Sequence, residues 1–171
     1  QLATAFAQAA SRDAHWERVA ALRDGRTVLE GLEIDQDLSW QLLVSLAAGG
    51  KVTRDDIAAA LEADNTSKGA EMAAQARASL PGVESKLIEW SALVDTNSVP
   101  NTVLRSAAAG IVNPATREDL NDFVTRYFDM LLRVWNERTF QIASYLVELL
   151  YPAPLANVEL RDITRQWLAD N

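Results

Sequence analysis

The sequence predicts an all-α fold, and three observations point to it. Apolar residues make up 49% of the 171 residues, and much of that share is alanine, the best helix former and a poor strand former. The seven glycines and five prolines fall between apolar runs, where they would end helices. No stretch alternates apolar and polar residues with a period of two, so we expect no strands.

The first half of the chain reads as five helices separated by cap and turn residues. Thr53 and Asp56 have the spacing of a capping box, with Asp in place of the usual Glu. Gly25, Gly49 and Pro81 mark helix ends. The expected segments are Leu2 to Ala10, Asp13 to Asp24, Asp35 or Asp37 to Ala48, Thr53 to Leu61, and Asn65 to Leu80.

The second half reads as five more helices. Pro100 stands at a first helical position, where its missing N–H costs nothing. Thr116 and Asp119 repeat the capping-box spacing before the strongest amphipathic run of the chain, and we expect that run to break near Asn136. The expected segments are Val83 to Val94, Pro100 to Ile111, Thr116 to Trp135, Phe140 to Leu149, and Asn157 to Trp167.

The spacing of these helices predicts how they assemble. Their starts lie roughly 15 to 20 residues apart with short linkers, the pattern of antiparallel helix pairs stacked on neighbouring pairs. We therefore expect one domain over residues 1–171: an all-α, HEAT-like α-solenoid of stacked antiparallel helix pairs. A compact helical bundle is the alternative.

Composition and charge exclude several functions. A net charge of −8, from 24 acidic and 16 basic residues, repels phosphate backbones, so we expect no nucleic-acid partner. No apolar stretch reaches the roughly 20 residues that a membrane-spanning helix needs, so we expect no membrane partner. Cysteine is absent, which removes disulfides and thiolate ligands and fits a reducing compartment; we expect a cytoplasmic location.

Candidate catalytic groups are few. His15 is the single histidine, whereas a catalytic zinc site commonly uses two or three, often as HExxH. We expect His15 to be structural or on the surface, and we expect no catalytic and no metal-binding residue in this chain. The acidic pairs Asp55-Asp56 and Glu118-Asp119 stand at expected helix N-termini, where carboxylates favour the helix dipole.

Aromatic residues of the amphipathic run and the helix after it could line a ligand groove, but at helical spacing they are more often core. We expect core for all five. They are Tyr127, Phe128, Trp135, Phe140 and Tyr145.

The segment DLSWQLLVSLAAGG, from Asp37 to Gly50, resembles the C-terminal helical domain of the aminopeptidase N family of zinc metallopeptidases. Further landmarks of that family follow in the same order. They are Asp64-Asn65-Thr66 with Gly69, Ala70 to Leu80 before Pro81, Lys86 with Trp90, Tyr127-Phe128 with Trp135, and Leu149 to Pro152. The sequence departs from the family pattern at Ser39, where Arg is frequent, and at Tyr151, where Phe is commoner.

The resemblance implies that residues 1–171 are a C-terminal fragment of a larger zinc aminopeptidase. It implies no cofactor in this segment and zinc in an upstream catalytic domain of the same polypeptide, which removes N-terminal residues from peptides. It also implies that the helical domain closes over the catalytic domain, encloses the peptide chamber and restricts entry. The expected partners are that catalytic domain and peptide substrates.

Three arginines, Arg126, Arg133 and Arg138, are candidate contacts for acidic or C-terminal carboxylate groups of a peptide, with surface ion pairing to Asp122, Asp129 and Glu137 as the alternative. In an excised domain we also expect one abnormally apolar face, which would favour self-association of the fragment.

Two other functions remain open from the sequence. One is a free-standing α-solenoid that binds a protein or peptide on its concave face. The other is the helical ligand-binding domain of a regulator.

Overall fold

Ten α-helices and two 3₁₀ segments, with no strand, make up the protein in the computed structural model, which describes residues 1–171. The all-α prediction is confirmed. In chain order the elements are α1 (Leu2–Gln8), α2 (Asp13–Arg23), α3 (Gln36–Ala48), α4 (Arg54–Ala63), α5 (Ser67–Ser79), α6 (Val83–Val94), α7 (Asn101–Ile111), η1 (Pro114–Phe123), α8 (Val124–Glu137), α9 (Phe140–Leu149), η2 (Ala153–Leu155) and α10 (Val158–Asp170).

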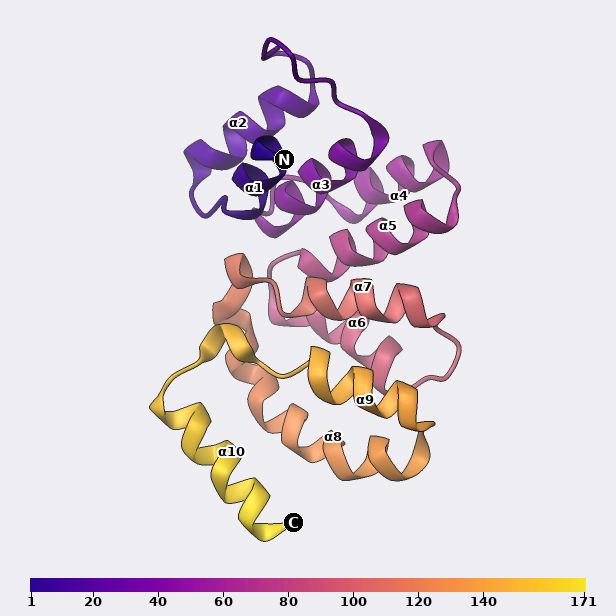
Figure 1. Cartoon of the computed structure of the whole chain (residues 1–171), viewed down its shortest axis with the longest axis vertical. Helices are drawn as coiled ribbons and strands as arrows, with labels where there is room; N and C mark the ends of the chain where they lie inside the picture. The colour runs from indigo at the N-terminus through magenta and orange to yellow at the C-terminus, as the bar shows by residue number, and fades with distance from the viewer.

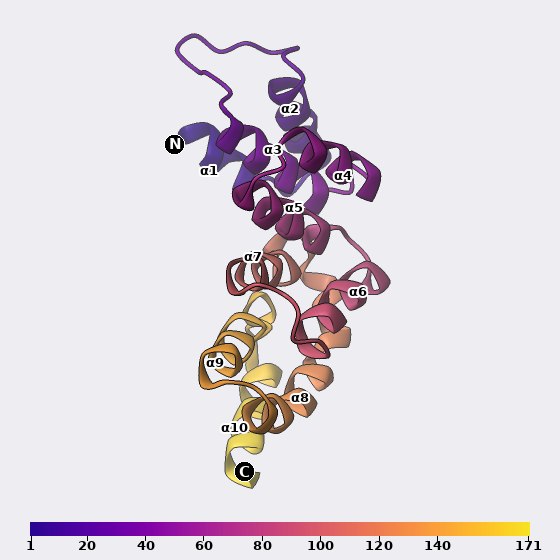
Figure 2. The ribbon, with the colours of Figure 1, turned by 90° about the vertical axis from the view of Figure 1, so that its right-hand side faces the viewer.

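The helices stack into an elongated column that runs from the N-terminus at one end to α10 at the other (Figure 1). Along this column the odd-numbered helices α1, α3, α5, α7 and α9 contact one another in turn, and α2, α4, α6 and α8 each contact the odd-numbered helix that follows. Figure 2 shows α7 and α9 on one side of the column and α6 and α8 on the other. This two-layered column is solenoid-like and excludes the compact bundle, while the HEAT-like description stays a prediction.

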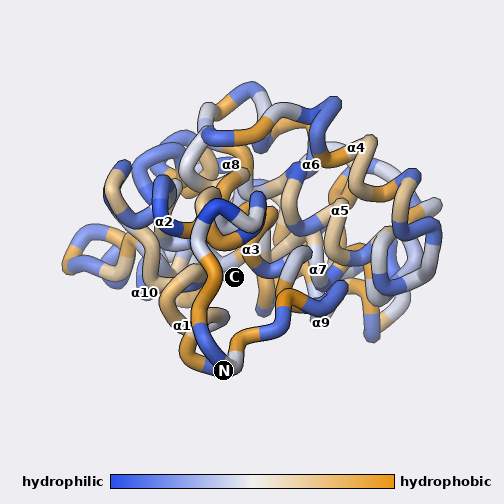
Figure 3. Tube along the Cα trace, turned by 90° about the horizontal axis from the view of Figure 1, so that it is seen from above, coloured by the Kyte–Doolittle hydropathy of each residue, from blue (hydrophilic) through white to orange (hydrophobic).

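The hydrophobic core is divided into three clusters along the column, as expected where each helix contacts only its neighbours. Leu42 and Leu46 of α3 face the first helices, whereas Trp40 and Leu43 of the same helix face α4 and α5. The largest cluster joins α5 to α10. Most helices carry both hydrophobic and hydrophilic residues along their trace (Figure 3), and no helix has the length and apolar character to cross a bilayer.

Several predicted helix starts are confirmed by side-chain caps. Asp35 accepts a hydrogen bond from the N–H of Leu38 at 2.8 Å. Thr53 and Asp56 form the predicted capping box. Thr66 caps α5 by accepting the N–H of Gly69, and Asn157 caps α10 by accepting the N–H of Leu160. These caps act within one turn of the chain, so the local sequence predicts them well.

The predicted capping box at Thr116 and Asp119 is wrong. Residues 114–123 form the 3₁₀ segment η1, and Thr116 inside it has non-helical angles of φ −115° and ψ 27°. The Thr116 hydroxyl donates back to the carbonyl of Asn113, and the carboxylate of Asp119 accepts the backbone N–H of Gly82 at 2.8 Å. A tertiary contact therefore replaces the local cap.

Two interpretations of glycine and proline also fail. Gly69 lies within the first turn of α5 and Gly110 within the last turn of α7, inside the helices rather than between them. A Cβ on Gly110 would collide with the backbone of Gln75 and the side chain of Ala78, so this glycine permits the close packing of α7 on α5. Pro100 is the N-cap of α7 rather than its first helical residue, which is Asn101.

The prediction that all five aromatic residues are core is wrong for two of them. Tyr127 and Phe128 are buried, but Trp135 is 52% exposed and Phe140 is 75% exposed. These two rings contact each other edge to face at the turn between α8 and α9, with centroids 5.7 Å apart. That turn lies at Arg138 and Thr139, slightly later than the predicted break near Asn136.

Candidate functional site

A groove and a cleft that share three lining residues lie next to each other on the surface of the column. The groove has a volume of about 280 Å³ and crosses α1, α3, α5 and α7. The cleft has a volume of about 680 Å³ and lies between the α1–α2 region and η1. Ala48, Pro114 and Ala115 line both.

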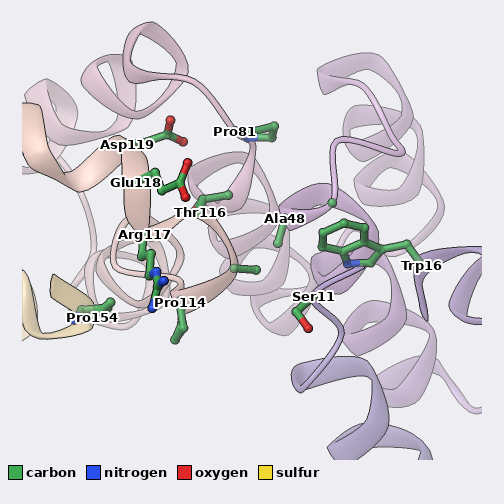
Figure 4. A pocket seen from close by; sticks show the side chains of 12 residues that line it. Ser11, Trp16, Ala48, Pro81, Pro114, Thr116, Arg117, Glu118, Asp119 and Pro154 are labelled. Atoms are coloured by element: carbon green, nitrogen blue, oxygen red, sulfur yellow. The ribbon is translucent and has the colours of Figure 1, made fainter. Parts of the chain in front are cut away.

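The cleft has two different walls (Figure 4). One wall carries the Trp16 indole beside Ser11 and Ala48, and the other carries Arg117 and Glu118 of η1. Pro81, Pro114 and Pro154 line the same cleft from three separate turns. Rigid prolines restrict the backbone at these turns, which favours a cleft that is formed before any ligand arrives.

Trp16 is held in the cleft by close packing on the end of α3. A Cβ on Gly49 would collide with the indole ring, so only glycine allows the ring to lie against the backbone here. The indole Nε1 is buried and has no hydrogen-bond partner in the protein.

Lys86 lies behind the η1 wall and joins three segments. Its side chain is 0% exposed, and its ammonium donates to the carbonyl of Ala78 at 3.1 Å. Burial lowers the pKa of Lys86 to about 8, an effect that the nearby carboxylate of Asp119 opposes. Asp119 also accepts the N–H of Gly82, and this bond ties η1 to the turn between α5 and α6.

Glu89 of α6 is the centre of a second cluster of charged side chains. It is 8% exposed, and its carboxylate accepts from Arg54 at 2.8 Å and lies 3.7 Å from Arg77. Two guanidinium groups from α4 and α5 thus neutralise one buried carboxylate, as buried charges require. The group is a structural tie between the middle helices.

The three candidate peptide-contact arginines lie on α8 and at its end but have different environments. Arg133 pairs with Asp95 after α6 at 2.9 Å, and Arg138 donates to the carbonyl of Val94 at 2.6 Å. Both therefore tie α8 to the end of α6. Arg126 is exposed and makes no hydrogen bond or ion pair to the protein. The expected helix-surface pairs with Asp122, Asp129 and Glu137 do not form.

His15 lies on α2, where its Nδ1 accepts the N–H of Ser11 at 3.3 Å and its ring contacts Phe6. It therefore occupies a structural position beside the first turn of the domain. No three His, Cys, Asp or Glu side chains gather in an arrangement suited to a metal ion.

Several residues of the hollow carry no sequence signal that could have identified them. The cleft residues Trp16, Arg117 and Glu118 come from segments about a hundred residues apart in the chain, which only the fold joins. The carboxamides of the groove are three isolated glutamines, one in each of α1, α3 and α5, and Asn113 after the end of α7. Lys86 did carry a signal, because a lysine four residues before Trp90 is a family landmark, although its burial was not predicted.

The architecture and the hollow define a helical, solenoid-like domain with its accessible space at the surface rather than in a closed core. The whole chain, residues 1–171, matches the family model of the ERAP1-like C-terminal domain. The chain therefore belongs to this family.

The chain is also similar to Aminopeptidase N of Streptomyces lividans. The two are 36% identical over 167 residues, an alignment that covers 98% of this chain and 20% of that protein. The chain thus spans about a fifth of the length of this relative. The predicted resemblance is confirmed: the protein is a C-terminal domain of the aminopeptidase N family.

Proposed function

We propose that residues 1–171 are the non-catalytic C-terminal domain of a zinc aminopeptidase, and that they enclose the peptide chamber and control which substrates enter. The parent polypeptide would hydrolyse N-terminal amino acids from peptides, with its zinc in an upstream catalytic domain. The observation that carries this proposal is the similarity to an aminopeptidase N over 98% of the chain. A cytoplasmic location remains part of the proposal.

The parent's zinc would supply a Lewis acid and an activated water in its own domain. The contribution of residues 1–171 would be geometric. A stiff column of helices with surface grooves can form one wall of a chamber, and its approach to the catalytic domain would exclude large substrates.

The experiment compares two substrates of the intact parent. Short peptides should be cleaved, whereas the free N-terminus of a folded protein of the same N-terminal sequence should be cleaved at least tenfold more slowly. Equal rates for both substrates would contradict the proposed control of access. The isolated chain with added zinc should not hydrolyse an aminoacyl-anilide, and turnover would contradict the non-catalytic role.

Arg126 is the candidate contact for a peptide carboxylate that has the most freedom to act, because Arg133 and Arg138 are already engaged with α6. Arg126→Ala in the parent should raise KM for peptides with a free C-terminus and leave KM for the amidated peptides unchanged. If the variant and the wild type have equal KM values for both peptide sets, Arg126 does not bind the peptide carboxylate. Arg133→Ala is the matched control on the same helix.

A free-standing scaffold for protein or peptide binding stays the second candidate. The groove across four helices favours it if the domain acts alone. Sequencing the gene distinguishes the two functions: an HExxH-containing region in the same open reading frame supports the aminopeptidase domain, and a frame without one supports the free-standing scaffold.

A further inference from the structure

The groove between α1, α3, α5 and α7 is electrically neutral, which sets it apart from the rest of this chain. None of its twelve lining residues is charged, although charged residues make up 23% of the protein and the net charge is −8. Neutral lining neither attracts nor repels a charged group, so it does not suit phosphate, metal or nucleic-acid ligands. It suits a ligand whose own contacting groups are neutral dipoles.

Five alanines and four carboxamide side chains line most of the groove. The alanines are Ala7, Ala10, Ala48, Ala109 and Ala115, and the carboxamides are Gln8, Gln41, Gln75 and Asn113. Each carboxamide offers both an N–H donor and a C=O acceptor.

The carboxamides are arranged one after another across the helices. Gln8, Gln41 and Gln75 come from α1, α3 and α5 at a nearly constant sequence spacing, and Asn113 follows the end of α7. These helices lie next to one another along the column (Figure 2), so the carboxamides reach the groove from successive helices. Carboxamides on successive helices can bind a linear ligand at successive points.

Part of this hydrogen-bonding capacity is unused within the protein. The Gln75 carboxamide makes no hydrogen bond to any other protein group, and Gln41 uses only its Oε1, which accepts from Gln8 at a long 3.5 Å. By contrast, Ser45 at the groove floor is already engaged, because its hydroxyl donates to the carbonyl of Ala7 at 2.6 Å. Asn113 is engaged as well, because its Nδ2 donates to the Ser79 hydroxyl at 3.3 Å and its Oδ1 accepts the N–H of Ala115 at 3.0 Å. The free groups are thus those of Gln41 on α3 and Gln75 on α5.

We propose that this groove binds the main chain of an extended peptide, through carboxamide hydrogen bonds that are independent of the peptide's side chains. An extended peptide presents one N–H and one C=O per residue and carries no charge along its backbone. Main-chain hydrogen bonds of this kind supply affinity without sequence specificity. A domain of this family that met many different peptides would require that property.

The inference rests on the proposed function for its occupant, a peptide substrate of the parent enzyme. The groove opens into the larger cleft through Ala48, Pro114 and Ala115, so a bound chain could continue past Trp16 and the η1 wall. Residues of the peptide distant from the scissile bond would occupy the groove. Short substrates would not reach it.

The test uses the intact parent enzyme and the double variant Gln41→Leu/Gln75→Leu, which removes the free carboxamides and keeps side-chain size. KM for a neutral peptide of about ten residues, which spans roughly 35 Å when extended, should rise about tenfold, because each neutral hydrogen bond contributes roughly threefold to tenfold. Kinetic parameters for an aminoacyl-anilide should not change. Gln141→Leu, on the exposed surface of α9, should behave as wild type.

A second measurement protects the test against a folding defect. The second peptide has the same sequence, but its backbone amides beyond the third residue are N-methylated and cannot donate hydrogen bonds. The wild-type enzyme should bind this peptide about tenfold more weakly than the unmodified one. The double variant should bind the two peptides equally well. This non-additivity requires direct contact between the carboxamides and the main chain. The thermal midpoint of the variant should stay within about 2 °C of wild type, as for a surface change.

Two results would overturn the inference. In one, KM for the long peptide is the same in the double variant and the wild type, and N-methylation has equal effects on both. In the other, the variant lowers the thermal midpoint of the parent with no change in peptide KM, which would mean that another segment of the same polypeptide fills the groove. Either result leaves the exclusion of folded substrates intact, whereas failure of the proposed function would abolish that exclusion.

Discussion

The indole Nε1 of Trp40 donates a hydrogen bond to the carboxylate of Asp64 at 2.7 Å, and this bond joins two family landmarks that are distant in sequence. Asp64 also accepts the hydroxyl of Thr66 at 2.9 Å, while Thr66 caps α5 through the N–H of Gly69. The landmark residues thus form one joint between α3, α4 and α5. Their role in this chain is to hold the helices in register.

Trp40→Phe should destabilise the domain by about 2 to 3 kcal/mol, because it removes a part-buried hydrogen bond and leaves space in the core around α3. Urea unfolding followed by circular dichroism measures the change. Trp135→Phe, at a 52% exposed position, is the matched control and should change stability by less than about 0.5 kcal/mol. Equal effects of the two substitutions would argue against the joint.

Gly69→Ala should destabilise the domain even though alanine is the better helix former. A Cβ at this position would collide with the backbone oxygen of Asp64, so we expect a loss of about 1 to 3 kcal/mol from overpacking. In an open helix the same substitution would stabilise by about 1 kcal/mol. The thermal midpoint of Gly69→Ala should be lower than that of the wild type. A higher midpoint would contradict the close approach of Gly69 to the Asp64 backbone.

Lys86 should make the stability of the domain increase with pH above about 8. The folded pKa of Lys86 is lowered to about 8 by burial, against an ordinary value of 10.5. Between these values the unfolded chain binds the proton that the folded chain has released, so the free energy of unfolding rises with pH. The penalty for burying the charge is fully present below pH 8 and amounts to about 3 kcal/mol.

The measurement is urea unfolding between pH 7 and pH 10, where the gain due to Lys86 should be about 2 kcal/mol. Lys86→Met should abolish it, and Lys68→Met, at an exposed position, should keep it. The upper limit avoids Tyr127, whose pKa is raised to about 12 by burial, with a further contribution from Tyr151. Above pH 10 folded Tyr127 retains a proton that the unfolded chain loses, which lowers stability.

The isolated domain should self-associate through the exposed aromatic pair of Trp135 and Phe140. These rings, with the half-exposed Leu132, form an apolar area at the turn between α8 and α9. Burying such an area between two copies removes it from water. Sedimentation velocity should show concentration-dependent association that Trp135→Ser/Phe140→Ser weakens, and a wild-type monomer at high concentration would contradict this.

The sequence predicts those parts of the structure that depend on neighbouring residues. Asp35, Thr53 and Thr66 act as caps within a single turn, and α6 begins and ends where its apolar pattern does. Thr116 shows the limit of such reasoning. The same capping-box spacing occurs there, but Asp119 is drawn to the N–H of Gly82, far away in the sequence, and the segment becomes a 3₁₀ helix.

The candidate site depends on contacts between distant segments, so the sequence predicts little of it. Gln41 and Gln75 are ordinary helix residues until α3 and α5 are placed side by side. Arg133 and Arg138 are candidate peptide contacts with ion pairing as the alternative, and their partners Asp95 and Val94 at the end of α6 could not be predicted from spacing along α8. Trp135 follows the helical pattern of a core residue and is nevertheless 52% exposed at the turn between α8 and α9, where it contacts Phe140.

The most direct test of the account is a crystal structure of the intact parent enzyme with a non-hydrolysable peptide of about ten residues, long enough to span roughly 35 Å. We predict that residues 1–171 lie across the peptide chamber, that the groove of Gln41 and Gln75 faces the peptide, and that both carboxamides lie within about 3.2 Å of main-chain atoms. A structure in which residues 1–171 project away from the zinc domain, with the groove open to solvent, would contradict the central claim.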